Sequence, residues 1–192
     1  MQPDDDPGWR LSRQMVGFLV PIIGNRRLRR PPRAGDDVLV LLRQTFLTLC
    51  LQLAAFGVVL GVMYPSAAPP RDRPTLIVIA LLGLSVVGVI WSARFTPPLN
   101  CATDASLIAS YRARFFLRIA FSESAALFGF VGYFLTYDWW PYPAGVLIAA
   151  IGFRYAAPTR SNLVRDQQRL TEQSCFRPLV RILRTSFPMS AD

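Results

Sequence analysis

The side chain in this sequence best placed to do chemistry is the carboxylate of Glu123, one of only two glutamates in 192 residues. It lies in an apolar stretch between Ile119 and Ala126, where a membrane-spanning helix is predicted. An ionised carboxylate in hydrocarbon costs several kcal/mol unless it is paired or protonated. We therefore expect Glu123 either to face other helices of a bundle or to carry a proton.

The residues that follow Glu123 resemble one helix of a known family. Residues 123–131 read Glu-Ser-Ala-Ala-Leu-Phe-Gly-Phe-Val. This is similar to the carboxylate-bearing helix of the rotor-ring subunit c of ATP synthases, in which an aliphatic residue, an aromatic residue and a glycine follow the membrane carboxylate. Leu127, Phe128 and Gly129 take those places here. The resemblance is local, covering residues 119–131, and implies that Glu123 binds a proton or a sodium ion. The chain lacks the partner helix with alternating glycines that lets subunit c pack into a ring.

The same helix carries a face of small residues, which favours a structural interpretation. Small side chains at helical spacing let another helix approach closely inside a membrane. The face consists of Ser122, Ala125, Ala126, Gly129 and Gly132. Glu123 can then hydrogen-bond to polar residues at helical spacing in the first predicted span. These candidate partners are Gln44, Thr48 and Gln52. A packed bundle with a polar clamp is the interpretation that we prefer.

Composition and motifs exclude several other kinds of site. Histidine is absent, which removes His-ligated haem, histidine zinc sites and histidine acid–base catalysis. Cys50, Cys101 and Cys175 are far apart and form no CxxC pair. We expect the latter two to be reduced thiols in the cytoplasm. No Walker loop, HExxH or GxSxG motif occurs. The sequence thus predicts no cofactor or metal site, and a membrane enzyme stays an alternative without a catalytic set.

Long apolar runs dominate the chain. Apolar residues make up 52% and charged residues 17% of the sequence, whereas a soluble domain is closer to a quarter charged. About 20 residues are needed to cross a bilayer as a helix. Four spans are predicted, at residues 38–63, 75–93, 115–137 and 140–157, of which the last is short. Residues 138–143 predict a turn at the far interface, part of which can extend that span. We therefore predict an all-α, polytopic four-helix transmembrane protein.

Polar segments flank the predicted transmembrane domain of residues 36–158. Residues 1–35 begin with an acidic, proline-containing stretch and end in a cluster of arginines, which predicts a disordered or interfacial basic arm. Residues 159–192 contain two short amphipathic segments, which predict a cytoplasmic tail. We expect this tail to lie on anionic lipid, or alternatively to dock on a partner protein.

Arginine is distributed very unevenly around the predicted spans. Seven arginines precede the first span, three lie between the second and the third, and seven lie from Arg154 onward. The connection after the first span holds two, Arg71 and Arg73, and the turn after the third holds none. Because positive residues concentrate on the cytoplasmic side, we predict a multi-pass protein of the cell membrane with both termini in the cytoplasm. Membrane topology also explains the net charge of +9 without a nucleic-acid partner.

These features predict a structural or accessory protein of the lipid bilayer, which packs with a second copy of itself or with subunits of a membrane complex. The alternative function is carboxylate-dependent translocation of a proton, an ion or a small solute through Glu123.

Overall fold

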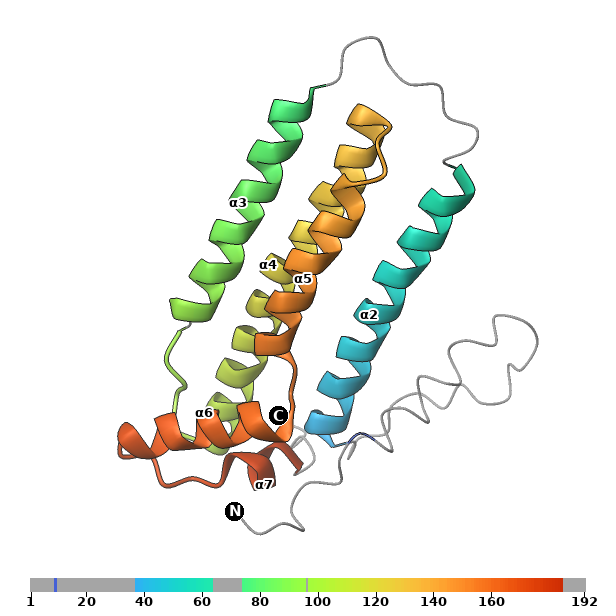
Figure 1. The fold of residues 1–192 in the computed structure, drawn as a ribbon. Coiled ribbons are helices and arrows are strands. Elements are labelled where there is room, and N and C mark those ends of the chain that lie inside the picture. The colour runs from blue at the N-terminus through green and yellow to red at the C-terminus, as the bar shows by residue number, and fades with distance from the viewer. Residues whose placement is uncertain (1–8, 10–36, 64–73, 96, 185–192) are drawn as a thin grey trace, which may run out of the picture. The chain divides into compact units, whose positions relative to one another are not determined.

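The computed structural model describes residues 9, 37–63, 74–95 and 97–184, which form helices and no strand. The helices are α2 (Val38–Met63), α3 (Thr75–Arg94), α4 (Asp104–Thr136), α5 (Pro141–Ala156), α6 (Arg160–Glu172) and α7 (Leu179–Arg184) (Figure 1). The predicted all-α class is confirmed for this part of the chain. The basic arm predicted for residues 1–35 lies outside the described residues, apart from Trp9.

Three of these helices, α2, α3 and α4, are long and apolar enough to cross a membrane. Their 26, 20 and 33 residues correspond to lengths of about 39, 30 and 50 Å at 1.5 Å per residue. The fourth predicted span coincides with α5, whose 16 residues reach about 24 Å, less than the ~30 Å of a hydrocarbon core. The described part of the chain therefore has three helices that fit a membrane protein.

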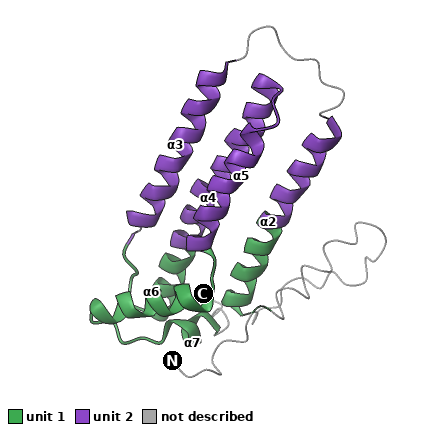
Figure 2. Cartoon of the chain, viewed as in Figure 1, with its two compact units in different colours: residues 1–49, 98–112, 157–192 green, residues 50–97, 113–156 purple. Residues whose placement is uncertain are grey.

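The chain divides into two compact units, which Figure 2 distinguishes by colour. Unit 1 comprises residues 1–49, 98–112 and 157–192, and unit 2 comprises residues 50–97 and 113–156. The helices α2 and α4 each continue from one unit into the other.

Unit 2 exposes many large apolar side chains on its outer surface. In α3, which runs beside α5, the buried side chains form a single stripe of Val78, Leu82, Ser85, Val89 and Ser92. The hydroxyls of Ser85 and Ser92 donate to carbonyl oxygens of their own helix. The outward side chains of α3 include Leu76, Ile77, Leu84, Val87 and Trp91, each more than half exposed. So large an apolar surface is unfavourable in water, and its natural solvent is lipid.

Unit 1 has an apolar core of the usual kind. The apolar side chains that are at most 1% exposed are Val38, Leu39, Leu42, Leu107, Leu163, Leu170, Leu179 and Leu183. They come from the beginnings of α2 and α4 and from the tail helices α6 and α7, which pack side by side. The apolar faces of the tail helices are thus used inside unit 1. Only their polar faces remain for a lipid surface or a partner.

Candidate functional site

A backbone-to-backbone contact joins α4 and α5 within unit 2. A Cβ atom added to Gly129 would lie 2.5 Å from the carbonyl oxygen of Pro141 and 3.2 Å from the Cα atom of Gly145. A Cβ atom added to Gly145 would overlap the carbonyl oxygen of Ala125 and lie 3.1 Å from the Cα atom of Gly129. These neighbours are backbone atoms, which cannot rotate away as a side chain can. The close approach of the two helices therefore requires glycine at both positions.

The other small residues of the predicted packing face lie along the same side of α4. Ser122 faces Gly152 of α5, where an added Cβ atom would overlap the Ser122 side chain. The Ser122 hydroxyl donates to the carbonyl oxygen of Arg118 at 2.7 Å, so its polarity is satisfied within α4. Gly132 packs against Val78 of α3, whose Cγ1 would lie 2.8 Å from an added Cβ atom. All members of the predicted face are buried, namely Ser122, Ala125, Ala126, Gly129 and Gly132.

Tyr142 connects α5 to α2 within unit 2, a role that the sequence did not reveal. Its hydroxyl donates to the carbonyl oxygen of Leu53. Its ring lies over Gly57, where an added Cβ atom would be 3.2 Å from Cε1. The buried core of this region joins Tyr142 to Leu60 and Tyr133. A side chain at Gly57 would displace the ring, so this glycine too is set by helix contact.

The turn predicted for residues 138–143 ends earlier than expected, because α5 begins at Pro141. The prolines at positions 141 and 143 have no N–H, but the first turn of a helix has no intrahelical acceptor for these groups anyway. Proline is accordingly favoured at the first helical position. The pair of prolines therefore begins the helix, and Tyr142 enters the core.

Glu123 is half-buried on α4 in unit 2. Within the described part of the chain, its carboxylate has neither a hydrogen-bond partner nor an ion-pair partner. Of the predicted partners, Gln52 is exposed and is not joined to Glu123. Gln44 and Thr48 belong to unit 1, where the Thr48 hydroxyl donates to the Gln44 carbonyl oxygen at 3.0 Å. The predicted polar clamp between Glu123 and these three residues is therefore absent from the described contacts.

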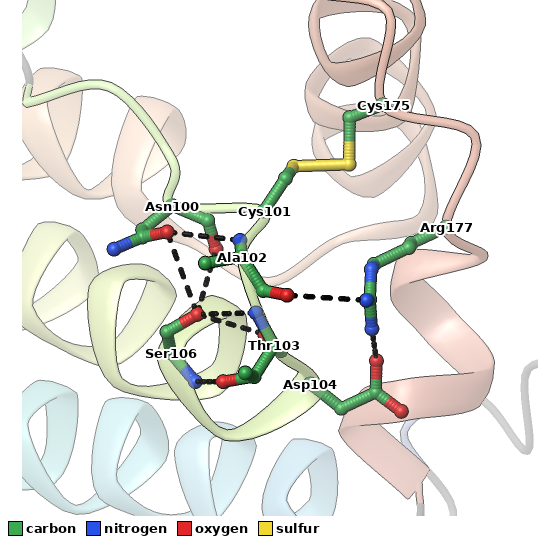
Figure 3. Close-up of polar contacts among 8 residues, drawn as sticks. All are labelled: Asn100, Cys101, Ala102, Thr103, Asp104, Ser106, Cys175 and Arg177. Atoms are coloured by element: carbon green, nitrogen blue, oxygen red, sulfur yellow. Dashed lines mark hydrogen bonds and ion pairs between the residues drawn. A yellow bond between two sulfur atoms is a disulfide. The ribbon is translucent and has the colours of Figure 1, made fainter.

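Unit 1 contains a disulfide between Cys101, before α4, and Cys175, after α6 (Figure 3). The two Cα atoms are 6.3 Å apart, although the residues are separated by 74 positions in the sequence. The expectation of two separate reduced thiols is corrected by this contact. The fold of unit 1 places the end of α6 beside the loop that leads into α4, a long-range proximity that cysteine spacing does not reveal.

Arg177 forms a second connection beside the disulfide. Its guanidinium pairs with the carboxylate of Asp104 and donates to the carbonyl oxygen of Ala102 at 3.3 Å (Figure 3). The side chain of Gln167 in α6 holds the same segment, donating to the Arg177 carbonyl oxygen at 3.0 Å and accepting from the backbone N–H of Leu179 at 2.7 Å. Covalent and polar links therefore fasten the segment between α6 and α7 to the start of α4.

Arg43 is a buried charge near the start of α2 in unit 1. An arginine one turn inside a span is expected to extend to the headgroups, but this side chain is 0% exposed. Its Nε donates to the carbonyl oxygen of Pro158 at 3.2 Å, and its guanidinium lies 5.2 Å from the ring centroid of Trp9. Arg43 therefore connects elements of unit 1 instead of reaching lipid.

The described residues offer two places that can carry function. One is the α4–α5 contact in unit 2 with the neighbouring carboxylate of Glu123, and the other is the linked cysteine pair of unit 1. Among the described residues, no group of three or more His, Cys, Asp or Glu side chains is arranged to hold a metal ion. Protein-family models, curated proteins and solved structures contain no match to the chain.

Proposed function

We propose that this chain is a multi-pass membrane protein of structural or accessory type, which packs in the bilayer against a second copy or against subunits of a membrane complex. The observation that carries the proposal is the apolar outer surface of unit 2, on which Leu76 and Leu84 of α3 are 82% and 61% exposed. The contact between α4 and α5 in the same unit is made by glycine, alanine and serine. An apolar outer surface, with small residues where two helices touch, is expected of helices packed in lipid.

The proposed topology has four spans, with α5 as the fourth and both termini in the cytoplasm of a cell-membrane protein. The contacts of α5 with α4 through Gly145 and Gly152 support its place among the spanning helices. Trp139, exposed just before α5, suits the interface, where tryptophan is enriched. Tilt or local thinning of the bilayer accommodates a short span at modest cost. The orientation is supported by the arginines that flank the helices.

Packing against another chain is supported by Gly83, on the outward side of α3. No atom lies within 4 Å of a Cβ atom added there, so the glycine serves no contact inside unit 2. Glycine in a helix interior is intrinsically less favourable than alanine by about 1 kcal/mol. In membranes, its use is to let a second helix approach. The outer face of α3 around Gly83 is the surface that we assign to a partner helix.

The test compares Gly83→Leu with Ile77→Phe, which adds bulk on another side of the exposed surface of α3. Each chain is extracted from its native membrane in mild detergent, sized, and examined for co-purifying chains. We expect the unaltered protein and Ile77→Phe to run as a complex larger than one chain, and Gly83→Leu to run as a monomer. An unaltered protein that is strictly monomeric and free of partners would refute the proposal.

A second candidate function is translocation of a proton, ion or small solute through Glu123. The observation that favours it is a half-buried carboxylate inside an apolar helix with no partner among the described residues. Such a group takes up a proton or cation on one side and releases it on the other only if it reaches both sides.

A hydrophobic carbodiimide tests this candidate, because it reacts with protonated carboxyls in the membrane. The chain provides its own control, since its second glutamate, Glu172, lies in the polar helix α6. Translocation predicts labelling of Glu123 that falls as pH rises, little labelling of Glu172, and loss of flux in Glu123→Gln. Unchanged flux in that variant would eliminate this function and leave the structural one intact.

A further inference from the structure

The Cys101–Cys175 pair has no role in packing helices in lipid, yet both cysteines are positioned by hydrogen bonds that do not involve the disulfide. The positions of the two cysteines therefore do not depend on the disulfide bond alone. In a structural disulfide the bond itself usually limits the freedom of its two segments. Here each cysteine occupies a locally stabilised backbone motif, so the two segments retain local order when the bond is open.

Cys101 lies in a loop stabilised by polar contacts at the start of α4 (Figure 3). Thr103 and Ser106 form a reciprocal capping box. The Thr103 N–H donates to the Ser106 hydroxyl at 2.9 Å, and the Ser106 N–H donates to the Thr103 hydroxyl at 3.1 Å. The Asn100 side chain accepts from the N–H of Ala102 at 3.0 Å, which closes a turn around Cys101.

Cys175 lies in a Schellman motif that ends α6. Its N–H donates to the Leu170 carbonyl oxygen at 2.8 Å, and the N–H of Ser174 donates to the Thr171 carbonyl oxygen at 3.0 Å. Ser174 takes the left-handed conformation that this motif requires, with φ of 60°. The Cys175 backbone is therefore set by the helix end, with or without a bond to Cys101.

The noncovalent link across the same gap is exposed. The side chains of Arg177 and Asp104 are 40% and 61% exposed, and a solvent-exposed ion pair contributes little to stability. With the disulfide open, this ion pair and the hydrogen bond to Ala102 still join the segment after α6 to the loop, beside the apolar packing of the tail helices. Among the described residues, the disulfide is the one covalent bond between the segment after α6 and the loop before α4.

We propose that Cys101 and Cys175 are a reversible thiol–disulfide pair, whose oxidation locks the α6–α7 tail to the start of α4 and whose reduction releases it. The oxidant is a disulfide, either a low-molecular-weight disulfide or that of an oxidoreductase. The more exposed Cys101 attacks it as the thiolate, forming a mixed disulfide and releasing one thiol. Cys175 then attacks the mixed disulfide, which forms the internal bond and releases the second thiol. Two electrons pass to the external disulfide, and the two cysteine protons end on the released thiols.

This inference goes beyond the proposed function, and only the resting state depends on the proposed orientation. On the cytoplasmic side, thiols are kept reduced, so the tail is released at rest and locks under oxidation. Cys50, the remaining cysteine, is not part of the pair. It supplies an internal reference, because the fully reduced chain has three thiols and the oxidised chain has one.

The test uses the full chain in native membrane vesicles, equilibrated with glutathione at defined ratios of reduced to oxidised forms. A maleimide carrying polyethylene glycol reports the number of free thiols by gel shift, and limited trypsin treatment reports release of the tail by cleavage after Arg181. We expect reversible conversion between one and three labelled thiols. We also expect at least about a tenfold faster cleavage in the reduced form, because native disulfides commonly contribute more than the 1.4 kcal/mol that corresponds to tenfold. Cys101→Ser should cleave at the fast rate under both conditions.

Three results would overturn the proposal. A pair that never oxidises, or one that resists native reduction, is not a reversible pair. A pair that cycles while cleavage after Arg181 stays constant does not control the tail. Labelling of Cys101 in intact cells by a membrane-impermeant maleimide would overturn the proposed orientation alone, since the thiol counts and cleavage rates are measured independently of the side.

Discussion

The Gly129–Gly145 contact makes a specific prediction about a single methyl group. In Gly145→Ala, the added Cβ would overlap the Ala125 carbonyl oxygen and lie 3.1 Å from the Cα atom of Gly129. Relief requires separation of two helix backbones, and overpacking of this kind typically costs about 1–3 kcal/mol. The change also gains about 1 kcal/mol of helix propensity. Because these effects oppose each other, the single variant alone does not isolate the steric term.

Gly83→Ala supplies the matched control. It carries the same gain in propensity, but no atom lies within 4 Å of the added Cβ atom. Alanine is small enough to preserve a close helix contact on that outer face. The difference between the two variants therefore removes the propensity term and leaves about 1–3 kcal/mol of steric cost.

The assay is thermal unfolding of both variants and the parent chain in the same mild detergent. Unfolding is measured as the fraction of protein that no longer elutes at its original size after heating. A change of 1 kcal/mol shifts Tm by about 2–4 °C in a protein of this size. We expect Gly145→Ala to unfold several degrees below Gly83→Ala, which should equal or exceed the parent. Equal Tm values for the two variants would refute the α4–α5 contact as described.

Three further predictions test other parts of the structure. Tyr142→Phe removes a buried hydrogen bond to the α2 backbone and should lower the free energy of unfolding by about 0.5–1.5 kcal/mol, measured by the same thermal assay. Arg43→Met keeps much of the side-chain volume but removes a charged donor from a buried carbonyl, and should cost about 1.5–3 kcal/mol in that assay; an unchanged Tm would show that the contact contributes nothing. Reporter fusions after Leu99 should read cytoplasmic and fusions after Pro143 should read outside, and either reversed result would break the four-span topology.

Features that depend on the solvent were predictable from the sequence, whereas those that depend on long-range packing were not. Residues 38–63 and 75–93 were predicted as helices from long, mainly apolar runs, and α2 and α3 occupy Val38–Met63 and Thr75–Arg94. The small-residue face of α4 follows from its helical spacing alone. The residues of α5 that contact this face could not be identified from the sequence. Gly145 and Gly152 become informative only once the two helices are known to be adjacent.

Tyr142 and Arg43 show that the long-range partners of polar side chains could not be identified from the sequence either. Tyrosine between two prolines fits an interfacial turn as well as a first helical turn, and only the position of α2 makes its hydroxyl a buried donor. An arginine near the end of a span fits extension to the headgroups equally well. Inside unit 1 its Nε donates to the carbonyl oxygen of Pro158, which is 115 positions away. In both cases the hydrogen-bond partner of the buried side chain lies far away in the sequence.

The arginine distribution and the disulfide point to opposite sides of the membrane, and they act at different stages. Flanking arginines bias orientation while the chain inserts, before unit 1 has folded. The disulfide forms only after folding has brought Cys101 and Cys175 together, and its occupancy then follows the local oxidant. A permanent bond would require the arginine-rich side to face an oxidising compartment, against a bias of seventeen flanking arginines to two. A reversible pair satisfies both observations, because the fold can bring two thiols together in a reducing compartment without keeping them oxidised.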